Sequence, residues 1–218
     1  MNEEQGGLRA GLRARKKERT HQAISEAAIA LFLARGYDRV SVAEVAAAAE
    51  VSKPTLFRYF PAKEDLVLHR FADHQGEWAR VVRDRAPGES PLTALHAHFG
   101  RGLREHDPVT GLNDHPAVLA FLGLVYSTPA LQGRLARFRA EDQDALAGAL
   151  REAAAAGPDD LAPRLAAAQL VAVHQVLADE NWRKIGAGRS ADEVQPEAVE
   201  DADRAFGLLA AGLAGRFG

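Results

Sequence analysis

Residues 51–66 read VSKPTLFRYFPAKEDL, and this stretch combines a helix start with an unusual density of aromatic and basic side chains. Ser52 is a typical helix N-cap, and Pro54 in the first turn loses no hydrogen bond because an N–H there would have no intrahelical partner. At 3.6 residues per turn, Leu56 and Phe60 share one face, whereas Pro54 lies on the opposite face. One buried face cannot hold all the rings, so part of this helix is expected to contact something outside its own core.

Two further helices are predicted before this stretch. Apolar residues between positions 15 and 34 recur at spacings of three, four and seven, and Gly36 follows as a stop signal. Ser41 and Glu44 then form the S-x-x-E capping box of a short second helix. Two short capped helices joined by a tight turn form a helix-turn-helix, whose second helix presents its N-terminal residues to the major groove of DNA. The side chains left on the exposed side of that helix are Lys53, Pro54, Thr55 and Phe57.

The helix order and the string AISEAAIALFLARGYDRVSVAEVAAAAEVSKPTLFRYFPAKEDL at residues 23–66 resemble the TetR family of bacterial transcriptional repressors. The matching pattern is long and ungapped and covers about a fifth of the chain. The resemblance implies an all-α fold of about nine helices, with an N-terminal three-helix DNA-binding head and a larger helical domain for ligand binding and dimerisation. The predicted divisions are a flexible basic arm at 1–14, the helix-turn-helix domain at 15–62 and the ligand-binding and dimerisation domain at 63–218.

The resemblance also implies DNA contacts, position by position. Bases or the adjacent sugar-phosphate would be contacted by Lys53, Pro54 and Thr55. Phosphates would be held by Ser41, Tyr59 and Lys63, and Phe57 would pack on the DNA backbone or a thymine methyl group. Ser52, at the helix start, completes the predicted interface. For Arg58 two roles remain open, a further phosphate contact or simple solvation.

The sequence departs from the family pattern at three places. Glu50 stands where the turn usually has glycine, which leaves the turn geometry open. Phe57 stands where tyrosine is common, so a hydroxyl–phosphate bond is lost. Val42 and Ala43 carry no hydrogen-bonding group, and we expect the second helix to contribute little to sequence recognition.

Charge is unevenly distributed along the chain. The net charge is −3, but residues 8–63 contain 11 Lys and Arg against 5 Asp and Glu, whereas residues 64–218 contain 16 against 23. A basic N-terminal quarter on an acidic body favours binding of a polyanion, because phosphate contacts dominate affinity for nucleic acids. Chance unevenness of surface charge is the alternative. The basic segment 9–19 either follows DNA phosphates, enters a minor groove, or is a solvated tail.

The rest of the chain is predicted to be helical. Helices are expected over 63–85, 91–106, 117–126, from 127 to about 156, 162–185 and 196–217, and the apolar stretch 117–126 is expected to be a buried central helix. Candidate ligand contacts are the aromatic and imidazole side chains of interior helices, although each of them is individually more typical of core packing. They are Trp78, His96, Phe99, Phe121, Tyr126, His174 and Trp182.

The last two predicted helices have sizeable apolar faces. In the family, the corresponding pair meets its twin as a four-helix bundle across a two-fold axis, so a homodimer is expected. The predicted interface residues are Leu165, Ala172 and Val176 on one helix and Phe206, Leu209 and Leu213 on the other. Purely internal packing of these faces is the alternative.

Several functional classes are disfavoured by the sequence. The chain has no cysteine, which removes disulfides and thiolate chemistry. No apolar run is long enough for a membrane span and no signal peptide is predicted, so the protein is expected to be cytoplasmic. We find no catalytic, cofactor or metal motif, and neither an enzyme activity nor a cofactor is predicted. From the resemblance we expect a sequence-specific DNA-binding regulator, a homodimeric repressor that a small-molecule ligand releases from a near-palindromic operator. The alternative is a helical dimer that binds a ligand or partner without recognising an operator.

Overall fold

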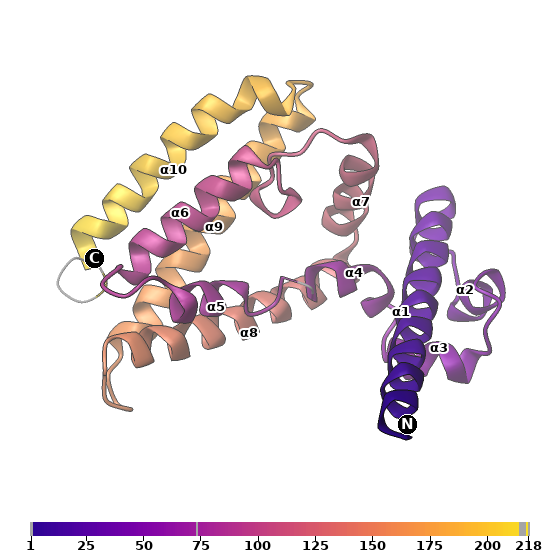
Figure 1. The fold of residues 1–218 in the computed structure, drawn as a ribbon. Coiled ribbons are helices and arrows are strands. Elements are labelled where there is room, and N and C mark those ends of the chain that lie inside the picture. The colour runs from indigo at the N-terminus through magenta and orange to yellow at the C-terminus, as the bar shows by residue number, and fades with distance from the viewer. Residues whose placement is uncertain (1, 73, 214–216, 218) are drawn as a thin grey trace. The chain divides into compact units, whose positions relative to one another are not determined.

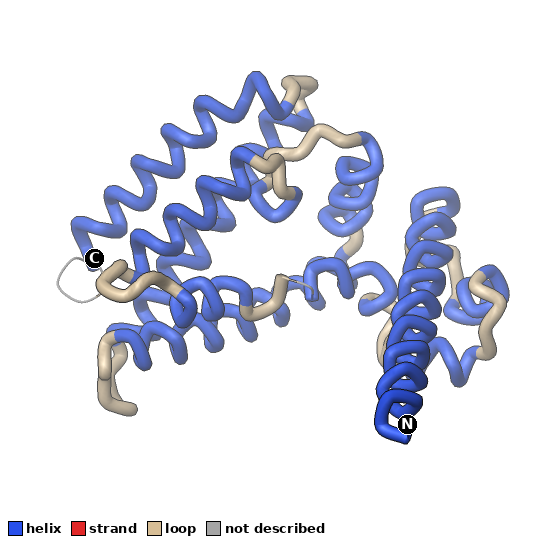
Figure 2. The backbone as a smooth tube through the Cα atoms, in the orientation of Figure 1, coloured by secondary structure: helices blue, strands red, loops and turns tan. Residues whose placement is uncertain are grey.

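The computed structural model describes the backbone of residues 2–72, 74–213 and 217, and the side chains of residues 15–69, 71, 74–212 and 217. All regular elements of this part are helices, which confirms the all-α class (Figure 2). Ten α-helices and one 3₁₀ turn are present there, one α-helix more than the sequence predicted. They are α1 (Asn2–Arg35), α2 (Val42–Ala48), α3 (Lys53–Tyr59), α4 (Asp65–Ala72), α5 (Glu77–Asp84), α6 (Pro91–Arg104), η1 (Pro108–Thr110), α7 (Pro116–Ser127), α8 (Pro129–Ala153), α9 (Ala162–Gly186) and α10 (Ala191–Leu213). No described helix is long and apolar enough to cross a membrane.

The chain forms two compact units. Unit 1 comprises Met1–Asp73 and Ala120–Leu135, and unit 2 comprises His74–Leu119 and Ala136–Gly218, so that α7 and α8 contribute residues to both. This grouping places α4 with the N-terminal helices, whereas the sequence boundary was expected at residue 63. The backbone of residues 2–14 continues α1, where a flexible arm was expected, and the side chains of that segment lie outside the described residues.

Unit 1 is organised around α1, which packs against α2 and α4 (Figure 1). Its core is apolar and almost fully shielded from solvent, because the helical spacing of each segment brings one apolar stripe inward. The central residues are Ile24, Phe32, Val45, Leu56 and Phe60, each no more than 1% exposed. Leu56 and Phe60, which the helical spacing predicted to share one face, both lie in this core.

Unit 2 is a helical bundle in which α10 packs against α6 and α9, and α5 packs against α6. The turn η1 is fixed against α9 by two features. The side-chain amide of the buried Asn181 donates a 2.9 Å hydrogen bond to the carbonyl of Thr110. At Gly111, with φ of 72°, a Cβ would lie 2.0 Å from the carbonyl oxygen of Ala178, so only glycine permits this approach.

The predicted single helix over 63–85 is wrong, because the chain is interrupted between α4 and α5. Gly76 adopts a left-handed φ of 70° and begins α5. Its N–H donates a 2.7 Å hydrogen bond to the carboxylate of Asp142 on α8, which holds the new helix start. Burial raises the pKa of Asp142.

Two other helices differ from the prediction. Helix α10 begins five residues before Pro196, because Ser190 and Glu193 form a capping box: the N–H of Ser190 donates to Glu193, and the N–H of Glu193 donates to Ser190 Oγ. Helix α7 was expected to be buried on all sides, but residues 117–120 are half-buried or exposed. Its buried side chains are Phe121, Leu122 and Val125.

Candidate functional site

The first helix of the helix-turn-helix begins with a complete capping box. The N–H of Glu44 donates to Ser41 Oγ at 3.3 Å, and the N–H of Ser41 donates to Glu44 Oε2 at 2.8 Å. Arg35, the last residue of α1, donates to Glu44 Oε1 at 2.7 Å. The hydrogen bonds from Ser41 and then Arg35 lower the pKa of Glu44 to about 2, so this carboxylate is ionised at neutral pH. The start of α2 is therefore tied to the end of α1.

The turn between α2 and α3 has a left-handed residue at Glu50, with φ of 53°. The N–H of Val51 donates to the carbonyl of Ala46 at 2.9 Å, and the N–H of Glu50 donates to the carbonyl of Ala47 at 3.1 Å. This is the Schellman arrangement, in which glycine is the usual left-handed residue. The turn thus keeps its geometry without glycine, at the cost of backbone strain at Glu50.

Helix α3 divides into a buried and an exposed face. Leu56 is fully buried, whereas the ring of Phe57 is 39% exposed. Lys53 and Pro54 are also exposed, and the Lys53 ammonium lies 5.9 Å from the centroid of the Phe57 ring. A cation beside an exposed ring at the start of this helix offers both charge for a phosphate and an apolar surface for a base or sugar.

The hydroxyl groups predicted to hold DNA already have partners in the protein. Ser41 Oγ donates to the Glu44 carboxylate at 2.8 Å, so its single proton is used within the capping box. Ser52 Oγ accepts from the N–H of Thr55 at 3.2 Å and shares a 2.8 Å hydrogen bond with Thr55 Oγ1. Only one of the two hydroxyl protons is used in that hydrogen bond, so the other hydroxyl group can still donate to a phosphate. The DNA contacts of Ser41, Ser52 and Thr55 remain predictions.

The C-terminal half of α3 carries Arg58 and Tyr59. The Arg58 guanidinium is exposed and lies 5.6 Å from the centroid of the Tyr59 ring. The Tyr59 ring is half-buried and lies 6.3 Å from the ring of His21 on α1. Arg58 is therefore positioned by a neighbouring aromatic ring, and both of its predicted roles remain open.

The structure places Lys63 differently from the other predicted contacts. Its ammonium donates a 2.6 Å hydrogen bond to the carbonyl of Tyr37 and lies 4.1 Å from the centroid of the Tyr37 ring. Burial, followed by the nearby Glu64 carboxylate, raises the pKa of Tyr37. Lys63 therefore stabilises unit 1 through its hydrogen bond to Tyr37. To contact a phosphate, its ammonium would have to give up this hydrogen bond.

Three predicted ligand contacts meet at a cavity of about 220 Å³ inside unit 2. Trp78 on α5 and Phe99 on α6 contact the ring of His174 on α9 edge-on, at centroid distances of 4.6 and 5.2 Å. Sequence reasoning missed the polar side chains that line the same cavity. They are Glu77, His98, Arg101, Glu105, Asp107 and Thr110.

The four other ligand candidates do not line this cavity. His96 stacks on Phe206 at a centroid distance of 4.8 Å, and its Nε2 lies 2.8 Å from the carboxylate of Asp203. Phe121 stacks on Phe71 within unit 1, at 5.9 Å. Tyr126 belongs to unit 1, and Trp182 on α9 lies away from the cavity lining. Aromatic type alone could not separate these core residues from those of the cavity.

The residues of the predicted dimer faces differ in their exposure in the single chain. On α9, Leu165 and Val176 are 52% and 68% exposed, and Ala172 between them is exposed. On α10, Phe206 and Leu209 are buried in the core of unit 2, whereas the prediction had placed them on an exposed dimer face. The exposed apolar residue of that helix is Leu208, which is 79% exposed and which the sequence reasoning missed. The side chain of Leu213 lies outside the described residues.

Comparison with known proteins agrees with this architecture. Residues 24–69 match the family described as bacterial regulatory proteins, tetR family. The chain is 32% identical over 198 residues to the HTH-type transcriptional regulator TcmR of Streptomyces glaucescens, covering 89% of this chain and 87% of TcmR. The chain belongs to the TetR family.

Solved structures related to this TetR-family protein share its fold. NalD of Pseudomonas aeruginosa, described as the secondary repressor of the MexAB-OprM multidrug efflux pump, has a TM-score of 0.58 at 20% identity, covering 87% of this chain and 96% of NalD. The SmeT–triclosan complex has a TM-score of 0.55 at 19% identity, covering 89% of this chain and 91% of that chain. This protein is accordingly a DNA-binding transcriptional regulator, with the α2–α3 pair as its DNA-binding element.

Proposed function

We propose that this TetR-family protein is a homodimeric repressor that binds a near-palindromic operator and is released from it by a small-molecule effector. The observation that carries the proposal is the division of α3, where Leu56 is fully buried while Lys53, Pro54 and Phe57 face solvent. An exposed basic and apolar helix face with a rigid support suits insertion into the major groove.

A second copy of the chain is needed because one short helix makes few DNA contacts. Two helix-turn-helix elements about 34–36 Å apart contact successive major grooves of a near-palindromic site. The exposed apolar residues of α9 and α10, among them Val176 and Leu208, supply a self-complementary face for that copy. Helices α9 and α10 pack against each other, so these side chains can contribute to one surface (Figure 1).

The cavity of unit 2 is the proposed effector site. It lies among α5, α6, η1 and α9, and it combines the aromatic Trp78 and Phe99 with polar side chains, which is the composition of a small-molecule pocket. An effector that binds more tightly to the form unable to hold DNA lowers operator affinity, and such couplings are typically about 5–150-fold.

Selection of bound fragments from genomic DNA tests the proposal. The purified dimer should enrich a short near-palindrome, and a duplex with only one half-site should bind more weakly. Failure of a folded dimer to enrich any sequence would favour the alternative, a helical protein that binds a ligand or partner without recognising an operator.

A further inference from the structure

The proposed effector cavity has an aromatic interior built around His174. Its ring meets Trp78 at an interplanar angle of 89° and Phe99 at 77°. Burial, and then the charge of Arg139, lower the pKa of His174 to about 4, so the imidazole is neutral at pH 7. No hydrogen bond to this ring is made within the described residues, although the ring lines the cavity. The ring is half-buried and lines the cavity, where a guest can offer it a hydrogen-bond partner.

The remainder of the lining is acidic. Three carboxylates, Glu77, Glu105 and Asp107, face one guanidinium, Arg101. Burial lowers the pKa of His98, so this imidazole adds no positive charge at neutral pH. With both histidines neutral, the lining carries two more negative than positive charges.

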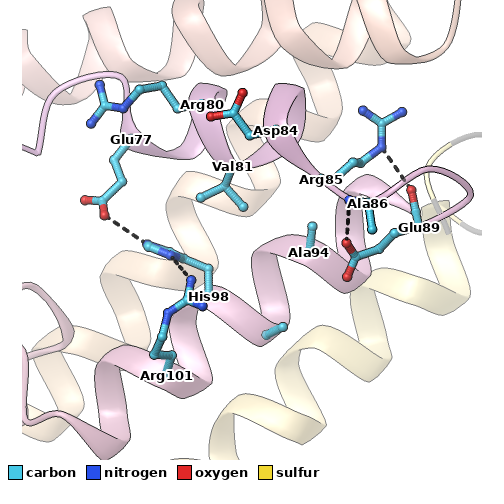
Figure 3. A pocket seen from close by; sticks show the side chains of 11 residues that line it. Glu77, Arg80, Val81, Asp84, Arg85, Ala86, Glu89, Ala94, His98 and Arg101 are labelled. Atoms are coloured by element: carbon cyan, nitrogen blue, oxygen red, sulfur yellow. Dashed lines mark hydrogen bonds and ion pairs between the residues drawn. The ribbon is translucent and has the colours of Figure 1, made fainter.

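Glu77 is held in a fixed position on this wall. Its Oε2 lies 2.8 Å from Nδ1 of His74, and its Oε1 lies 3.4 Å from Nε2 of His98. Arg101 contributes to the arrangement, because its Nη2 lies 3.1 Å from Nδ1 of His98 and can only donate. Figure 3 shows these contacts from Glu77 through His98 to Arg101. Because Arg101 donates to Nδ1, we assign the proton of neutral His98 to Nε2, which faces Glu77.

Three residues of the cavity lining also line a second groove. Glu77, His98 and Arg101 belong to a groove of about 470 Å³ between α5 and α6, together with Arg80, Asp84, Arg85 and Glu89 (Figure 3). Acidic and basic side chains are balanced in this groove, whereas the inner cavity is acidic. The excess of negative charge is therefore a property of the aromatic cavity.

We propose that the effector is a small organic cation with a flat apolar group, whose charge pairs with Glu77 and whose ring packs against Trp78 and His174. The regulatory role of this cation rests on the proposed function, whereas its binding is argued from the residues that line the cavity. A carboxylate in the lining attracts a cation by charge, and an aromatic ring in the same lining attracts it by the ring quadrupole. The volume of about 220 Å³ limits the guest to a molecule smaller than a typical drug.

Three probes of similar size and different charge test this chemistry. Benzyltrimethylammonium is the cation, neopentylbenzene is its uncharged carbon isostere, and phenylacetate is an anion. The chain has two tryptophans, so a Trp182→Phe background leaves Trp78 as the only tryptophan reporter. Fluorescence titration should show at least tenfold tighter binding of the cation than of the neutral isostere, and weakest binding of the anion. Equal affinities, or tighter binding of the anion, would overturn the proposal.

Variants locate the charge that is recognised. Glu77→Gln should weaken cation binding about tenfold and leave the neutral isostere unchanged. Glu200→Gln, on the exposed surface of α10, is the matched control and should change neither. Glu105→Gln, at an exposed position of the lining, should weaken the cation about twofold and gives a second test if Glu77→Gln does not fold. Unchanged cation affinity in both Glu77→Gln and Glu105→Gln would refute the proposal that the carboxylates of the cavity lining bind the cation.

These titrations contain no DNA, so they fail or succeed separately from the proposed function. Adding the cation to the protein–operator complex tests the regulatory step. Release of DNA by the cation in the wild type but not in Glu77→Gln supports both proposals. Tight cation binding without DNA release would contradict the effector role while leaving the site chemistry in place.

Discussion

The ammonium of Lys63 lies 2.6 Å from the backbone carbonyl of Tyr37 and donates a hydrogen bond to it. This bond joins the segment after the helix-turn-helix to the segment that follows α1. The ammonium also lies within cation–π distance of the Phe32 ring, at 5.4 Å, and of the Tyr37 ring. Lys63 and Lys53, both predicted to contact DNA, therefore have different surroundings in the protein.

Alanine at these two lysines should separate stability from DNA binding. Lys63→Ala removes a charge-assisted hydrogen bond and should lower the free energy of unfolding by about 1–2 kcal/mol. Lys53→Ala removes an exposed side chain and should change that free energy by less than about 0.5 kcal/mol while weakening operator binding. Urea unfolding and DNA titration of both variants check this. Equal loss of stability in the two would contradict the assignment.

The left-handed turn at Glu50 predicts a stabilising substitution. Glu50→Gly relieves the strain of φ at 53° and should raise the free energy of unfolding by about 0.5–1 kcal/mol. Ala47→Gly, three residues earlier on the exposed face of α2, is the control and should lower it by up to about 1 kcal/mol. Thermal and urea unfolding report both. A Glu50→Gly protein less stable than the wild type would show that the carboxylate compensates for the strain.

The exposed face of α9 and α10 predicts where a charge breaks the dimer. Val176→Asp and Leu208→Asp should each give a folded monomer, because both side chains are largely exposed in the single chain. Phe206→Asp places a carboxylate in the core of unit 2 and should instead unfold it. Sedimentation equilibrium with circular dichroism distinguishes these outcomes. Fully dimeric Val176→Asp and Leu208→Asp proteins would place the interface elsewhere.

The half-buried imidazole of His174 predicts a pH dependence of stability. Its folded pKa is lowered to about 4 from an ordinary value of 6.5, so below pH 6.5 the unfolded chain binds a proton that the folded chain does not. The contribution of His174 to the free energy of unfolding is therefore fully present above pH 6.5. It is progressively lost as the pH falls from 6.5 to about 4. His174→Gln should make the free energy of unfolding depend less on pH between about 4 and 6.5, as measured by urea unfolding at each pH. An unchanged slope would mean that folding does not lower the pKa of His174.

Local signals in the sequence predicted the helix-turn-helix because each of its steps is encoded within a few residues. Ser41 with Glu44, and Ser52 with Pro54, define the helix starts, and the spacing of Leu56 and Phe60 defines the buried face. Ser190 and Glu193 have the same capping-box spacing, and they begin α10 at Ala191. The predicted start at residue 196 did not take this capping box into account. The break at Gly76 depends on Asp142, which is 66 residues away, and local pattern does not contain such a contact.

Candidate sites in unit 2 were predicted less well because helix periodicity does not say which neighbour covers a face. Phe206 and Leu208 are two residues apart on an apolar helix, yet the first is buried against His96 and Phe99 and the second is exposed. His96 was predicted as a ligand contact, but the packing of α5, α6 and α9 places His98, two residues later, at the cavity instead. Trp78, Phe99 and His174 were among the candidates because of their residue type.

Binding to the selected operator duplex across a range of salt concentrations tests the central claim most directly. Fluorescence anisotropy of the wild-type dimer should show a log affinity that falls linearly with log salt, with a slope of about −0.9 for each phosphate contacted. Lys53→Ala should bind more weakly at every salt concentration while remaining a folded dimer. Binding that does not depend on salt, or an affinity unchanged in Lys53→Ala, would contradict the assignment of α3 as the helix that contacts DNA.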